Sequence, residues 1–254
     1  MIKGHFINGQ WQSGSAAKPN INPSDLSDVV GEYVEGGAAE AQQAIAAAKA
    51  AFPAWSTASP QVRFDVLDKA GTQILERREV LGRLLAREEG KTLPEAIGEV
   101  VRAGQIFKFF AGETLRLNGE ILPSVRPGLE VQIFRQPLGV VGLITPWNFP
   151  IAIPAWKLAP ALACGNTVVL KPADLTPASA WSLFEILERA GLPKGVANLV
   201  IGRGSTVGQA LVESPDVNGI SITGSVSTGR AIVARCAVLG KRVQAQMGGK
   251  NPMI

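Results

Sequence analysis

Apolar residues recur at helical spacing in three segments of the first half of the chain. These segments predict helices over 38–51, 60–77 and 93–117. Pro53 should end the first helix, because a proline interrupts the hydrogen bonds of a helix interior. Before the first helix, the Asn8–Gly9 step stands between two short alternating runs, which indicates a β-hairpin. The first half of the chain is therefore expected to form a hairpin followed by a layer of helices.

The hydrophobic pattern changes near residue 120. Residues 129–135 alternate apolar and polar side chains, which is typical of a strand with one exposed face. After them, short apolar runs alternate with helix-length segments: strands are expected at 140–144, 167–170, 197–201, 220–223 and 242–246, and helices at 153–163, 178–190, from 205 onward and at 225–238. Connections of this length join parallel strands. The predicted fold class is α/β, with a doubly wound parallel sheet covered by helices on both faces.

Composition excludes several classes of protein. The chain has 254 residues, 46% of them hydrophobic and 18% charged, enough for one large core or two modest ones. No apolar stretch reaches the about 18 residues that a membrane span needs. The 25 Lys and Arg residues are scattered among 21 Asp and Glu residues, so nucleic acid is not an expected partner. The start of the chain lacks the layout of a secretory signal, and we expect a cytoplasmic protein.

The cysteine and histidine content predicts no metal site. Cys164 and Cys236 lie in apolar or helical contexts without CxxC spacing, and His5 is the single histidine. Reduced, structural thiols are the expected state.

Candidate chemistry lies in four loops that follow strands, because a ligand of a doubly wound sheet binds beyond the carboxyl ends of the strands. In the first loop, Thr145–Pro150, two prolines fix the backbone around Asn148, whose amide is a hydrogen-bond donor. A rigid turn without chemistry is the alternative. In the second loop, Lys171 ends an apolar strand and Asp174 follows three residues later. An exposed strand-end lysine is the alternative there.

The other two loops precede helices. Gly202–Gly208 resembles the GxGxxG pattern, in which glycines let the backbone approach a phosphate, but its last glycine lies one residue too far along. The pattern alone is weak. Thr223–Ser225 starts the next helix, and a plain N-cap is the alternative interpretation of Ser225.

Together these loops resemble the aldehyde dehydrogenase superfamily. The segments that carry the resemblance, in the order and spacing of the family, are Pro146–Pro150, Gly165–Pro172, Gly202–Gly204, Thr223–Ser225 and Met247–Pro252. Together with Pro154–Pro160, the last segment is most similar to bacterial semialdehyde dehydrogenases such as 2-oxoglutarate semialdehyde dehydrogenase. The resemblance implies a Rossmann-like fold with four parts: a helical layer in 1–118, an oligomerisation hairpin in 119–138, an NAD(P)-binding core in 139–249 and the start of a truncated catalytic domain in 250–254.

The resemblance also implies a role for each candidate residue. Asn148 would donate its amide to the oxyanion of a thiohemiacetal. Lys171 and Asp174 would hold the adenosine ribose, and Ser225 would contact the pyrophosphate. The remaining residues of the implied cofactor site are Ile144, Thr145, Pro146, Trp147, Gly202, Gly204 and Gly248. An acid at position 174 repels a 2′-phosphate, so NAD is the expected cofactor and NADP the alternative.

Two departures from the family pattern affect the expected activity. The resemblance places the nucleophilic cysteine a few tens of residues beyond the Gly-Gly segment, and neither Cys164 nor Cys236 occupies its motif. Gln246 stands where the family normally has a glutamate as general base, and an amide cannot accept that proton. We expect the full-length enzyme to oxidise an aldehyde, such as a semialdehyde, as a homo-oligomer, and this chain alone to be inactive. The alternative is a non-catalytic nucleotide-binding or scaffold protein derived from a truncated dehydrogenase.

Overall fold

A sheet of seven strands forms the centre of the protein. The structure, a computed structural model, describes residues 2–14 and 16–249. The strands are β1 (His5–Ile7), β2 (Gln10–Gln12), β7 (Val140–Ile144), β8 (Thr167–Lys171), β9 (Ala197–Leu199), β10 (Gly219–Gly224) and β11 (Arg242–Met247), in the spatial order β11-β10-β7-β8-β9-β1-β2. From β11 to β9 neighbouring strands are parallel, and β1 and β2 extend the sheet antiparallel to them. The predicted parallel sheet is confirmed.

Helices connect the parallel strands, the first two on one face of the sheet and the last two on the other. They are α5 (Ala152–Ala163), α6 (Pro177–Ala190), a π-helical turn η1 (Gly204–Gly208) that continues into α7 (Gln209–Glu213), and α8 (Val226–Val238). The chain winds outward from β7 first toward β9 and then toward β11. The direction of winding therefore reverses between β7 and β10, and the loops that follow these two strands diverge and leave a crevice.

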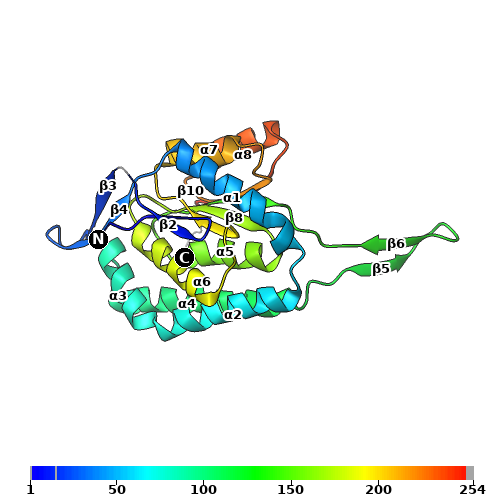
Figure 1. Cartoon of the computed structure of the whole chain (residues 1–254), viewed down its shortest axis with the longest axis horizontal. Helices are drawn as coiled ribbons and strands as arrows, with labels where there is room; N and C mark the ends of the chain where they lie inside the picture. The colour runs from blue at the N-terminus through cyan, green and yellow to red at the C-terminus, as the bar shows by residue number, and fades with distance from the viewer. Residues whose placement is uncertain (1, 15, 250–254) are drawn as a thin grey trace, which may run out of the picture.

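Four N-terminal helices cover the sheet, one more than the sequence pattern predicts. They are α1 (Ala38–Ser56), α2 (Pro60–Glu76), α3 (Arg78–Glu89) and α4 (Leu93–Thr114). The helices α2, α3 and α4 pack against α5 and α6 on one face of the sheet, whereas α1 lies on the opposite face beside α7 (Figure 1). The prediction of a single helical layer is therefore wrong for α1, whose stripe of Ala41, Ala44, Ile45 and Ala48 packs on the strands of that face.

The expectation that Pro53 ends the first helix is also wrong, because α1 continues to Ser56. The side chain of Trp55 is 2% exposed, and its indole Nε1 donates a hydrogen bond to the carbonyl oxygen of Leu162 at 3.2 Å. Proline lacks the N–H of one helical hydrogen bond, and burial of this indole offsets that loss in the last turn of α1.

Two hairpins precede α1. The predicted one joins β1 to β2 through Asn8 and Gly9, whose φ angles of 53° and 71° are those of a tight hairpin turn. The second, which the pattern did not predict, pairs β3 (Ala17–Ile21) with β4 (Val29–Val34).

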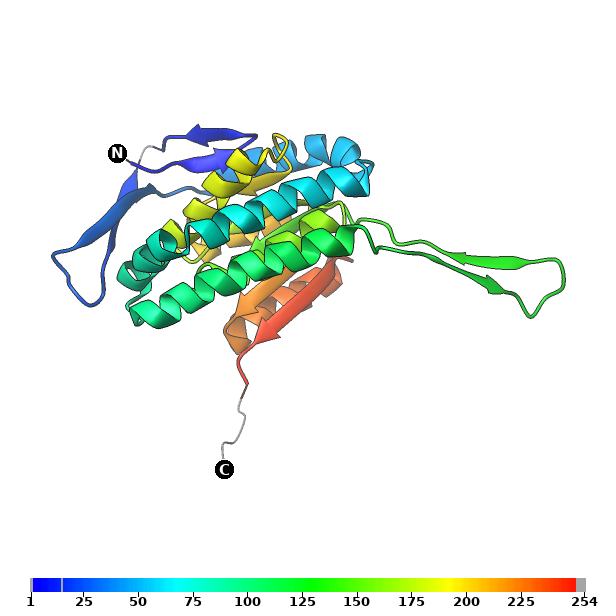
Figure 2. The same ribbon diagram turned by 90° about the horizontal axis from the view of Figure 1, so that it is seen from below.

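A third hairpin extends away from the body of the protein (Figures 1 and 2). It pairs β5 (Glu120–Pro123) with β6 (Glu130–Ile133), and every residue of the two strands is exposed. The prediction of a strand here is confirmed, but the expected buried face is absent from the described residues because no other element packs on β6. None of the described helices combines the length and the apolar character that crossing a membrane requires.

Candidate functional site

The loops after β7, β8, β10 and β11 surround an open cleft of about 640 Å³ at the crevice of the sheet. Eleven of the twelve predicted site residues line it: Ile144, Thr145, Pro146, Trp147, Asn148, Lys171, Asp174, Gly204, Ser225, Gln246 and Gly248. Segments far apart in the sequence therefore contribute to one surface. The twelfth residue, Gly202, lies outside the lining.

The turn between β7 and α5 brings Asn148 to the cleft. Its backbone carbonyl oxygen accepts a hydrogen bond from Lys91 Nζ at 3.0 Å. Its side-chain amide forms no hydrogen bond within residues 2–14 and 16–249, so it is available to a ligand. The flanking Trp147 and Phe149 are also exposed, at 53% and 45%. The turn thus presents an aromatic surface and a free amide to solvent.

Lys171 is buried at the end of β8, with only 4% of its surface exposed. Its Nζ donates hydrogen bonds to the backbone carbonyl oxygens of Gly202 at 3.0 Å and Pro172 at 2.5 Å. Burial lowers the pKa of Lys171, and the nearby carboxylate of Asp174 opposes this shift. The alternative of an ordinary exposed lysine at a strand end is therefore wrong.

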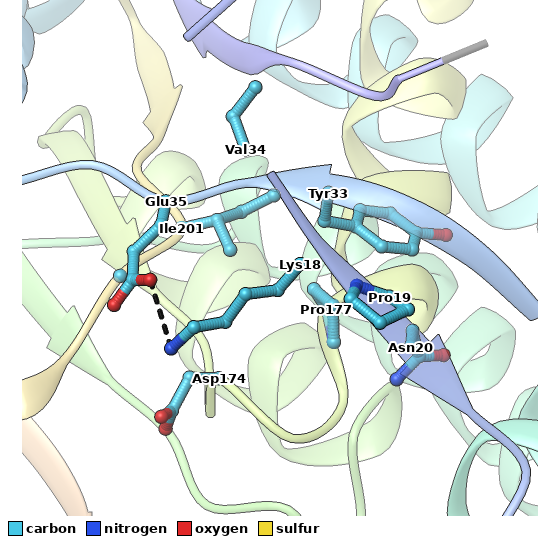
Figure 3. A pocket seen from close by; sticks show the side chains of 10 residues that line it. Lys18, Pro19, Asn20, Tyr33, Val34, Glu35, Asp174, Pro177 and Ile201 are labelled. Atoms are coloured by element: carbon cyan, nitrogen blue, oxygen red, sulfur yellow. Dashed lines mark ion pairs between the residues drawn. The ribbon is translucent and has the colours of Figure 1, made fainter. Parts of the chain in front are cut away.

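Gly202 packs closely against another backbone segment. A Cβ at this position would lie 2.4 Å from the carbonyl oxygen of Gly36, with which Gly202 forms an isolated β-bridge. Gly202 lines a small pocket beside the cleft, and Asp174 lines both. Figure 3 shows Asp174 in this small pocket, near Lys18. In this pocket Glu35 pairs with Lys18 at 2.9 Å, and from outside the lining Arg203 Nε donates to Glu35 at 2.9 Å. Two cations, one of which lines the pocket together with Asp174, are thus held by one carboxylate.

Two helices begin at the cleft. The Oγ of Ser225 accepts a hydrogen bond from the backbone N–H of Thr228 at 3.2 Å, so Ser225 is the N-cap of α8 as one interpretation predicted. The predicted helix from residue 205 begins as the π-helical turn η1. The first N–H groups of a helix have no intrahelical partner, and such termini attract phosphate groups.

An apolar slot continues the cleft between α7 and α8, and sequence reasoning missed it. Its lining includes Val212, Ala231 and Ile232, and it shares Ile144 and Gly204 with the main cleft. In the sequence these apolar residues resemble ordinary core positions of two helices. Only the packing of the helices shows that the residues border a hollow.

Gln246 lies at the end of the edge strand β11, and its Oε1 accepts a hydrogen bond from Thr223 Oγ1 at 3.3 Å. A neighbouring hollow, which Gln246 also lines, contains Lys157, another residue that sequence reasoning missed. Lys157 Nζ donates to Ser221 Oγ at 2.7 Å and to Gln244 Oε1 at 3.2 Å, and burial lowers the pKa of Lys157 to about 8. The signal for it was a lysine within the apolar sequence of α5.

The cysteines lie away from the cleft. Cys236 is buried, as a structural thiol would be, whereas Cys164 at the end of α5 is exposed. Desolvation by the surrounding protein raises the pKa of each thiol. Throughout the part of the chain that the structure describes, no cluster of three or more His, Cys, Asp or Glu residues could hold a metal ion.

Comparison with known proteins confirms the predicted resemblance. The model of the aldehyde dehydrogenase family matches residues 11–254. Alpha-ketoglutaric semialdehyde dehydrogenase from Bacillus subtilis is 45% identical over 98% of this chain and 52% of its own length. Among solved structures, an NADP-dependent enzyme from E. coli has 39% identity and a TM-score of 0.94 over 97% of this chain and 52% of its own. Betaine aldehyde dehydrogenase from Staphylococcus aureus in complex with NAD+ has 36% identity and a TM-score of 0.94 over 98% of this chain and 50% of its own. The chain spans about half the length of these relatives.

Proposed function

Because this chain belongs to the aldehyde dehydrogenase family, we propose that it holds the nicotinamide dinucleotide and the oxyanion donor of an enzyme that oxidises an aldehyde to the carboxylic acid. The observation that carries the proposal is the convergence of eleven predicted residues on one cleft at the switch point of the sheet. Similarity to alpha-ketoglutaric semialdehyde dehydrogenase supports a semialdehyde as the substrate class.

The residues of the cleft fit a dinucleotide. Both hydrogen bonds of the buried Lys171 ammonium go to backbone carbonyl oxygens, which leaves its third proton for a ribose hydroxyl beside Asp174. Thr145 Oγ1 is buried and has no hydrogen-bond partner among the described residues. The start of α8 at Ser225 suits the pyrophosphate, and the apolar slot between α7 and α8 suits the adenine ring. When bound, the dinucleotide supplies the acceptor for the hydride of the aldehyde.

We propose NAD as the preferred cofactor, with NADP as an accepted alternative. Asp174 is exposed at the rim of the cleft, where its carboxylate repels a 2′-phosphate. Lys18, which lines the small pocket with Asp174, and Arg203 are both paired with Glu35, so their charges are less available to a phosphate.

Asn148 is proposed to act on the carbonyl oxygen of the aldehyde. An amide donor stabilises the negative charge that develops there when a nucleophile adds to the carbonyl carbon, and a fixed donor needs little reorganisation during the reaction. Gln246 borders the same cleft, but its amide cannot take a proton from water. We also propose that the full-length protein is a homo-oligomer and that the β5–β6 hairpin takes part in its assembly.

A second candidate function is nucleotide binding without turnover, as in a scaffold protein derived from a dehydrogenase. The position of Gln246 in the cleft favours it, because a group that cannot act as a base stands where the family has one. Both functions require a dinucleotide site, and they differ only in the oxidation step.

Calorimetric titration of the chain with NAD and NADP tests the dinucleotide site. Lys171→Ala should weaken NAD binding by about 1–3 kcal/mol, because the ribose would lose a hydrogen bond to a charged donor. Lys49→Ala is the matched control: Lys49 pairs with Asp216 at 2.6 Å on the exposed side of α1, away from the cleft. No NAD binding by the unaltered chain, or equal affinity in Lys171→Ala, would contradict the proposal.

A further inference from the structure

The turn that carries Asn148 separates two hollows. One is the cleft already described, and the other lies against α4 and is lined by Lys91, Glu99 and Arg102. Trp147, Asn148 and Phe149 line both hollows. Contacts on the α4 side of the turn can therefore determine how Asn148 is presented on the cleft side.

Glu99 connects α4 to the start of α5. Its side chain is 2% exposed, and its Oε1 accepts hydrogen bonds from the backbone N–H groups of Ile151 and Ala152, both at 3.1 Å. These residues directly follow the turn. A carboxylate at this place also interacts favourably with the positive end of the α5 dipole. The second oxygen of the carboxylate, Oε2, accepts a hydrogen bond from Lys91 at 2.7 Å.

Lys91 extends the connection from Glu99 to the turn itself. Besides Glu99, its Nζ donates to the backbone carbonyl oxygen of Asn148 at 3.0 Å and lies 4.3 Å from the centre of the Phe149 ring. Glu89 adds an ion pair at 3.4 Å. The side chain of Lys91 is only 13% exposed, so water weakens these interactions less than it would at the surface.

We propose that Lys91 and Glu99 form a clamp that positions the amide of Asn148, with both acting as positioning residues. The inference rests on the proposed function, in which Asn148 is the oxyanion donor. Pro146 and Pro150 fix φ at their own positions and disfavour the helical conformation at the residue before each, so neither restricts Asn148 itself. The carbonyl orientation at Asn148 is fixed instead by the Lys91 ammonium, and the next N–H groups are fixed by the Glu99 carboxylate. Together these contacts hold the backbone on both sides of Phe149.

Nuclear magnetic resonance of the whole chain tests the clamp through the side-chain amide signal of Asn148, which Asn148→Ala identifies by its loss. Lys91→Met should shift this signal and speed hydrogen exchange at Ile151 and Ala152 by about tenfold or more, the equivalent of one charge-assisted hydrogen bond. Lys91→Arg keeps the charge. It should leave the Asn148 signal near its position in the unaltered chain and the two exchange rates within about threefold of the unaltered values. The matched control is Lys108→Met, which removes a similar ion pair, to Asp68 at 2.7 Å, between α2 and α4.

An unshifted Asn148 signal in Lys91→Met, or the same shift in Lys108→Met, would overturn the clamp. If Lys91→Met does not fold, Glu99→Gln serves in its place, since it keeps an oxygen for the two N–H groups but removes the charge that pairs with Lys91. If Lys91→Met shifts the Asn148 signal but the unaltered chain does not bind NAD, the clamp is supported and the proposed function is contradicted. If the unaltered chain binds NAD but Lys91→Met leaves the Asn148 signal unchanged, the proposed function is supported and the clamp is contradicted.

Discussion

Glu88 should make the stability of the fold depend on pH. Its carboxylate is buried between α3 and the start of α6, where it accepts hydrogen bonds from the N–H and Oγ of Ser179 at 2.9 and 2.6 Å and from the N–H of Ala178. Burial raises the pKa of Glu88 from 4.5 to about 7, although these hydrogen bonds and the charge of Lys3 favour the ionised form. The folded state therefore binds a proton more tightly than the unfolded chain does.

The sign and size of the effect follow from the two pKa values. Stability from the proton on Glu88 is fully present below pH 4.5 and is lost as the pH rises through 7. Between pH 5 and pH 8, the free energy of unfolding should fall by about 2.5 kcal/mol, since each unit of pKa difference is worth about 1.4 kcal/mol. A loss of this size is a large part of the about 5–15 kcal/mol that stabilises a typical domain.

Urea unfolding at pH 5 and pH 8 measures the effect in the unaltered chain and in Glu88→Gln. Glutamine does not titrate, so the difference in unfolding free energy between the two proteins should shrink by about 2–3 kcal/mol on going from pH 5 to pH 8. Glu79→Gln, at an exposed carboxylate of the same helix, is the control and should show no such change. An equal difference at both pH values would refute the assignment of the shift to Glu88.

Other predictions concern the chemistry and the assembly. The chain alone should form no NADH from short aldehydes, because neither cysteine lines the cleft; activity that Cys164→Ser abolishes would contradict this. Replacing residues 120–133 with a short Gly-Ser linker should shift the full-length protein to a smaller oligomer in light scattering. An unchanged mass would show that the hairpin takes no part in assembly. In a full-length form, Gln246→Glu should raise steady-state turnover by at least about a hundredfold, and equal turnover would mean that another group is the base.

The sequence predicts the central sheet well because parallel strands buried on both faces are continuous apolar runs, as at β7 and β8. It predicts the lining of the cleft for a related reason. Functional loops of such a sheet follow the carboxyl ends of its strands, so Asn148, Lys171 and Ser225 could be assigned to one region before any packing was known. The family resemblance added the identity of the ligand, and it added Gln246 and Gly248 to the predicted site.

What the sequence could not predict depends on long-range packing. An alanine-rich helix suits either face of a sheet, so periodicity alone does not place α1 opposite α2. The conformation at Pro53 depends on a contact between Trp55 and Leu162 across the fold. The contact of Lys91 with Asn148 spans 57 positions, and such polar contacts leave no periodic pattern in the sequence. The close packing of Gly202 on Gly36 was not predicted, because the spacing of glycines does not distinguish close packing of two backbones from close approach to a phosphate.

The register of β11 makes position 246 suited to a test of chemistry alone. Parallel pairing aligns Gln246 with Thr223, the residue whose hydroxyl donates to the side-chain Oε1 of Gln246. A glutamate has the same length, and its carboxylate can accept the same hydrogen bond. Residue 246 is exposed at the edge of the sheet, so the charge would remain solvated and should perturb the fold little. A gain of turnover in Gln246→Glu would therefore result from the added base and not from a change in structure. The free energy of unfolding of the present chain should be the same with Gln246 and with Gln246→Glu, and urea unfolding measures it.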